Sequence, residues 1–89
     1  MITKELEIIN RLGLHARAAA KLVHTSARFN SEVKIRKDDE EVDGKSILGI
    51  LLLAAGKGST IVVTAEGSDE QEALEAIEKL IRSRFDEAE

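Results

Sequence analysis

Residues 13–29, GLHARAAAKLVHTSARF, predict a helix that begins directly after a glycine-containing loop. The helix is expected over residues 16–29, with Asn30 following its C-terminus. Apolar residues at helical spacing predict that the helix buries one stripe, formed by Ala16, Ala20, Val23 and Ala27. The same spacing, displaced by one residue, predicts a second and basic stripe of Arg17, Lys21, His24 and Arg28.

The flanking sequence predicts strands and two further helices. Alternation of polar and apolar residues indicates strands at 2–9 and 32–37, with Val42 in a short return strand. The apolar run within residues 59–65 indicates a further strand that is covered on at least one face. Ser46 is expected to cap a short helix at 47–53, and residues 68–71 resemble a capping box before the last helix. The order βαββαβα favours a mostly antiparallel sheet with helices on one face, an α+β fold.

The composition limits the classes of protein that remain. A chain of 89 residues predicts a single domain, residues 1–89. It has no cysteine and only two histidines, so neither a disulfide, a metal site nor a bound cofactor is expected. No apolar run approaches the roughly 18–20 residues of a membrane span, which favours a cytoplasmic protein. The net charge of −4 and the 2% aromatic content argue against nucleic-acid binding.

Charge is distributed unevenly along the chain. Residues 66–89 hold nine acids and three bases, whereas residues 10–31 and 44–65 hold no acid at all. These two basic segments have two interpretations. They are either ordinary solvated surface or a local positive surface for an acidic partner or a phosphoryl group.

His15 lies at the predicted start of the first helix. The unpaired N–H groups and partial positive charge of a helix start disfavour an imidazolium and favour a dianionic phosphoryl group. Arg17, two residues later, is placed to contact phosphate oxygens. The pattern suits a phosphorylated histidine, although the spacing alone is more commonly that of an exposed histidine at a loop–helix junction. A metal shared with His24 is disfavoured because that residue lies more than two turns away.

The helix after Ser46 is almost entirely apolar. Its aliphatic side chains cannot all point inward from a short helix at the edge of a small domain, so an exposed apolar patch is expected. Either a partner protein or the flanking helices cover this patch.

Two motifs resemble those of the HPr family, the histidine-containing phosphocarriers of the bacterial phosphoenolpyruvate-dependent phosphotransferase system. Residues 13–17, GLHAR, resemble the family's phosphohistidine motif, and residues 45–51, KSILGIL, resemble its second signature with a regulatory serine. Chain length, element order and the turn at 65–67 also match. One departure is Ala18, where the motif usually has proline.

The resemblance implies an open-faced β-sandwich, with four antiparallel strands covered on one face by three helices. It implies that Nδ1 of His15 accepts a phosphoryl group from phosphorylated enzyme I and donates it to the A component of an enzyme II or a related regulatory acceptor. The chain is then a carrier with no turnover of its own, and a monomer is expected.

The resemblance also implies roles for individual residues. Arg17 and the N–H of Ala16 stabilise the phosphoryl group, and Ser46 is a substrate of HPr kinase/phosphorylase. Partner docking is expected on Ala20, Lys21, His24, Ile47, Leu48, Gly49 and Leu51. An alternative is a purely regulatory binding protein that acts through its Ser46-phosphorylated form.

Overall fold

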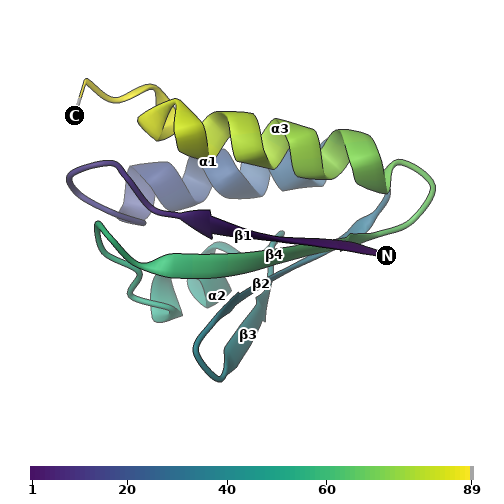
Figure 1. Ribbon diagram of the computed structural model, residues 1–89, viewed down its shortest axis with the longest axis horizontal. Helices are drawn as coiled ribbons and strands as arrows, with labels where there is room; N and C mark the ends of the chain where they lie inside the picture. Colours follow the sequence, from purple (N-terminus) through teal and green to yellow (C-terminus); the bar gives the residue numbers. More distant parts are fainter. Residues whose placement is uncertain (89) are drawn as a thin grey trace.

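A computed structural model describes residues 1–88 and has the predicted open-faced architecture (Figure 1). Its elements, in order, are β1 (Ile2–Glu7), α1 (Ala16–Ala27), β2 (Glu32–Lys37), β3 (Glu40–Asp43), α2 (Ile47–Leu52), β4 (Thr60–Glu66), α3 (Glu70–Arg82) and the 3-10 turn η1 (Arg84–Asp86). The strands form one antiparallel sheet in the order β1-β4-β2-β3. The predicted fold class is therefore confirmed. Glu89, the last residue of the expected domain, lies outside the described residues.

Alternation along the strands separates a helix-covered face of the sheet from an open one. In β4, Ile61, Val63 and Ala65 are buried, whereas Val62 and Thr64 between them are only partly covered. Lys4 in β1 interrupts the alternation because it is paired with Val63 and so lies on the helix side. Its ammonium group reaches Glu78 of α3 at 2.8 Å, which accounts for a lysine at this position.

Helices α1 and α3 lie side by side over the sheet and run in opposite directions (Figure 1). The prediction of which stripe α1 buries is wrong. Ala16, Ala20 and Ala27 are exposed, and only Val23 is partly buried. The helix instead buries Ala18, Ala19, Leu22 and Ser26. Alanines occur on both faces of this helix, so Leu22, its one large aliphatic residue that is fully buried, decides which face meets the core.

The start of α3 also differs from the predicted capping box. The N-cap is Asp69, whose carboxylate accepts hydrogen bonds from the Asn30 and Ser31 N–H groups at 2.9 Å and from the Ser31 hydroxyl. The Glu70 carboxylate accepts from the Gly67 N–H at 3.1 Å. Asp69 thus ties the loop after α1 to the start of α3, and Ser68 and Gln71 do not form the expected reciprocal pair.

The chain reverses after α3 through an unusual turn. Arg84, Phe85 and Asp86 have φ values of 58°, 55° and 62°, which is the left-handed region that non-glycine residues seldom occupy. The Phe85 side chain is fully buried and joins the hydrophobic core. This turn brings the C-terminal residues back toward the start of α1.

We predict that Leu22→Ala lowers the free energy of unfolding by about 2–5 kcal/mol, because it leaves a cavity in the core. The matched change Leu52→Ala, at a side chain that is 72% exposed, is expected to change it by less than about 0.5 kcal/mol. Denaturant titration measures both. Equal effects of the two substitutions would contradict the observed orientation of the helices.

We predict that the Asp69 carboxyl titrates below its ordinary pKa, first because the Ser31 hydroxyl donates to it and next because the Asn30 N–H does. The pKa is depressed in the folded state, so this contribution to stability is present above the unfolded pKa of about 4 and is lost as pH falls through the folded pKa. Carbon NMR of the carboxyl group measures the shift. Ser31→Ala should return the pKa of Asp69 toward its ordinary value.

Candidate functional site

The loop before α1 is fixed by contacts with the segment that follows α2. The Leu14 N–H donates to the Ala55 carbonyl at 2.8 Å, and the Leu14 side chain is buried. Gly13 has a φ of +66°, and a Cβ at this position would lie 2.6 Å from the Ala55 oxygen. Glycine is therefore required at this close approach, and it holds the next two residues in place.

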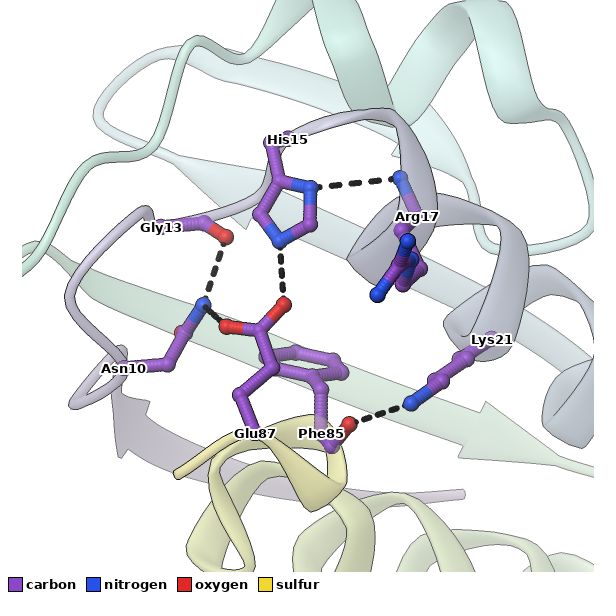
Figure 2. A network of polar contacts seen from close by, with 7 residues as sticks. All are labelled: Asn10, Gly13, His15, Arg17, Lys21, Phe85 and Glu87. Carbon is purple, nitrogen blue, oxygen red and sulfur yellow. Dashed lines mark hydrogen bonds and ion pairs between the residues drawn. The ribbon is translucent and has the colours of Figure 1, made fainter. Parts of the chain in front are cut away.

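His15 is the N-cap of α1, as the sequence analysis placed it. Its backbone is extended, with φ −72° and ψ 177°, and its carbonyl accepts the helix's hydrogen bond from the Ala19 N–H at 2.8 Å. Nδ1 of the ring accepts from the Arg17 N–H at 3.3 Å (Figure 2). The imidazole thus replaces the oxygen of the usual Ser, Thr, Asp or Asn cap. Its side chain is 27% exposed, which leaves the ring accessible from solvent.

The other ring nitrogen has a neighbour that the sequence analysis did not identify. Nε2 of His15 contacts Oε2 of Glu87, and Oε1 of the same carboxylate accepts from the Asn10 amide at 3.0 Å (Figure 2). The Asn10 amide also donates to the Gly13 carbonyl at 2.8 Å. His15 and Glu87 are 72 positions apart in the sequence, so no local pattern indicates their contact.

The pKa of Glu87 is lowered mainly because the Asn10 amide donates to its carboxylate, with His15 and Lys21 adding to the effect. A charged carboxylate therefore stands beside the imidazole. The prediction from the sequence considered only the helix terminus, whereas the structure also places this carboxylate against Nε2 of the ring.

Of the predicted basic stripe, Arg17 and His24 are exposed, and Arg17 makes no ion pair with another residue in 1–88. Lys21 is different, because its ammonium group donates to the Phe85 carbonyl at 2.6 Å and is partly buried (Figure 2). Lys21 therefore holds the C-terminal turn, a role that sequence spacing did not predict. Ala16 and Ala20 are exposed on the same helix.

Ser46 has the predicted capping role. Its hydroxyl oxygen accepts from the Gly49 N–H at 3.1 Å, and its carbonyl accepts from the Ile50 N–H. Gly49 is explained by packing, since a Cβ there would lie 3.0 Å from the Val42 side chain. Glycine at this position lets α2 approach β3 closely.

Most of α2 faces solvent, as its unbroken apolar sequence predicted. Only Ile50 is buried within the helix. The exposed fractions of Leu48 and Leu52 are both 72%, and Ile47 and Leu51 are 40% and 36% exposed. Leu12, in the loop before His15, is 60% exposed and adds a large apolar side chain that the sequence analysis missed.

The described residues contain no cluster of three or more His, Cys, Asp or Glu side chains suited to a metal ion. Among the same residues, no helix combines the length and apolar character needed to cross a bilayer.

Comparison with known proteins supplies the family. Residues 2–83 match the family model described as the PTS HPr component phosphorylation site. The phosphocarrier protein HPr of Cupriavidus necator is 49% identical over 89 residues, which is the full length of both chains. The crystal structure of an HPr from Thermoanaerobacter tengcongensis superposes with a TM-score of 0.97 at 43% identity and covers all of both chains. A second structure from that organism, described as an HPr dimer, has a TM-score of 0.79 at 45% identity and covers 92% of this chain and 94% of its own. These matches span nearly every residue described above, and the chain belongs to the HPr family of phosphotransferase-system phosphocarriers.

Proposed function

We propose that this chain carries a phosphoryl group on Nδ1 of His15. The group is accepted from phosphorylated enzyme I and donated to the A component of an enzyme II or a related regulatory acceptor. The observation that carries the proposal is the position of Nδ1, which accepts from the Arg17 N–H at the start of α1 and belongs to a partly exposed ring. We propose that this takes place in the cytoplasm, with the chain acting as a monomer and without turnover of its own.

The transfer is a displacement at phosphorus. The Nδ1 lone pair of His15 forms the new N–P bond, while the bond from phosphorus to the donor histidine breaks and its electron pair returns to that ring. Nδ1 then no longer accepts from the Arg17 N–H, and this donor turns to a phosphoryl oxygen. The Ala16 N–H adds a second donor and the exposed Arg17 guanidinium adds charge, so the helix start stabilises the dianion.

Docking is proposed on the exposed faces of α1 and α2. These helices pack against each other, and the segment that follows α2 lies beside the loop that precedes His15. An apolar centre with a basic rim suits a transient interface with an acidic partner. Among the aliphatic side chains of α2 that are assigned to this surface, Leu48 is the most exposed. Lys21 and Gly49 also have the structural roles described above. The proposed surface comprises Ala20, Lys21, His24, Ile47, Leu48, Gly49 and Leu51.

Ser46 is proposed as a regulatory phosphorylation site for an HPr kinase/phosphorylase. Its side chain already accepts a hydrogen bond from the first turn of α2, and phosphate oxygens are also good acceptors at a helix start. Phosphorylation would place about two negative charges beside the docking surface. Acidic partners would then bind more weakly while the fold is retained. This site also underlies the alternative function, a regulatory protein that does not use His15.

We predict that incubation with phosphoenolpyruvate, magnesium and enzyme I places one acid-labile phosphate on His15. His15→Ala should abolish the labelling, whereas the matched change His24→Ala should leave its stoichiometry unchanged. Mass spectrometry under alkaline conditions and phosphorus NMR measure the product. Labelling of the His15→Ala protein, or none of the wild type, would refute the carrier role. Full cellular activity of His15→Ala would instead favour the regulatory alternative.

We predict that Leu48→Ala weakens association with enzyme I by about 1–2 kcal/mol, roughly 5- to 30-fold in Kd, because a docking contact is truncated. The free energy of unfolding should stay within about 0.5 kcal/mol of the wild type, since the side chain is already in water. Calorimetric titration and denaturant unfolding separate the two effects. Unchanged affinity for every phosphotransferase partner would show that α2 is not part of the docking surface.

A further inference from the structure

The two nitrogens of the His15 ring face groups of opposite hydrogen-bonding character. A backbone donor, the Arg17 N–H, points at Nδ1, and a carboxylate acceptor, that of Glu87, contacts Nε2 (Figure 2). A neutral imidazole has one N–H and one bare nitrogen. The arrangement therefore selects the tautomer with the proton on Nε2 and leaves the lone pair on Nδ1.

Glu87 is held at this position by contacts on both sides. The Asn10 amide donates to its second carboxylate oxygen, and its own N–H donates to the Arg84 carbonyl at 2.9 Å. The preceding turn is anchored by the buried Phe85 side chain and by Lys21, which donates to the Phe85 carbonyl. The carboxylate is thus oriented by residues from the loop before α1, from α1 itself and from the C-terminal turn.

We propose that Glu87 is a positioning residue for phosphoryl transfer: it keeps the proton of His15 on Nε2, so that Nδ1 is the nucleophile. This inference rests on the proposed carrier function and adds to it a second functional group from the opposite end of the chain. Glu87 does not touch the phosphoryl group and acts only through the ring.

The same contact matters after transfer. When the Nδ1 lone pair forms the bond to phosphorus, the proton remains on Nε2 and the ring acquires a positive charge. The Glu87 carboxylate accepts the hydrogen bond from this N–H, and the bond strengthens as the charge develops. The donor histidine of enzyme I recovers its electron pair, so no other proton, oxidant or reductant takes part.

The first test reads the tautomer in the unphosphorylated chain. Proteins labelled with nitrogen-15 histidine are compared at a pH where both rings are neutral. The wild type should show a wide separation between the Nδ1 and Nε2 shifts of His15. This separation should narrow in Glu87→Gln and narrow further in Glu87→Ala. His24, which is exposed on α1, serves as the internal reference for the ring shifts, and the dispersion of the backbone amide spectrum confirms that the variants are folded.

The second test measures single-turnover transfer from phosphorylated enzyme I. Glu87→Gln keeps the shape of the side chain but removes its charge, and it should slow transfer roughly tenfold, as expected when a charge-assisted hydrogen bond becomes a neutral one. The matched control is Asp86→Asn. It removes one negative charge from the adjacent exposed residue, and asparagine tolerates the left-handed φ of 62°. The control should transfer at the wild-type rate.

Two results would overturn the role of Glu87. One is an unchanged separation of the His15 shifts in Glu87→Ala. The other is a Glu87→Gln protein that transfers as fast as the Asp86→Asn control. A wild-type chain that takes no phosphate would instead overturn the carrier function itself, so the two failures are distinguishable.

Discussion

The unpaired N–H groups at the start of α1 are the constraint on which the rest of the site depends. A helix start needs an acceptor, and here the acceptor is a ring nitrogen that is also the proposed nucleophile. Nδ1 can cap the helix and also act as the nucleophile only if the edge of the ring is held at a fixed position relative to the helix start. The bond from the Leu14 N–H to the Ala55 carbonyl and the positive φ of Gly13 hold the chain before the ring at that position.

The C-terminal turn combines an unfavourable backbone conformation with side-chain contacts that offset it. Left-handed backbone costs about 1–2 kcal/mol per residue outside glycine, and less for Asp86 because aspartate tolerates it. Burial of Phe85 returns about 1.5–3 kcal/mol, and a hydrogen bond from a charged donor such as Lys21 contributes a similar amount. The unfavourable backbone conformation and the favourable side-chain contacts nearly cancel, so the turn is not explained by its own stability. Its consequence for the molecule is the placement of Glu87 against the imidazole.

The sequence predicted the parts of this protein that depend on local pattern. Strand alternation, the Ser46 cap and the exposed apolar face of α2 all follow from neighbouring residues, and each is present. The buried face of α1 was mispredicted because its alanines give nearly equal apolar stripes, so the orientation depends on where Leu22 meets the sheet. The roles of Asp69, Lys21 and Glu87 were missed for a related reason. Each side chain bonds a partner at least 38 residues away, and only the folded chain brings such pairs together.

Ala18 shows how a departure from the family motif is accommodated. Its side chain is fully buried against the core, and its N–H precedes the first bond within the helix, from Ala19 to His15. Proline is tolerated in the first turn because such N–H groups lack a helical acceptor, so alanine loses no intrahelical bond there. Compared with proline, alanine leaves the backbone of the unfolded chain freer, which lowers the free energy of unfolding by about 0.4–1 kcal/mol. In return the first turn gains a further donor, at the same helix start where the phosphoryl group is proposed to bind.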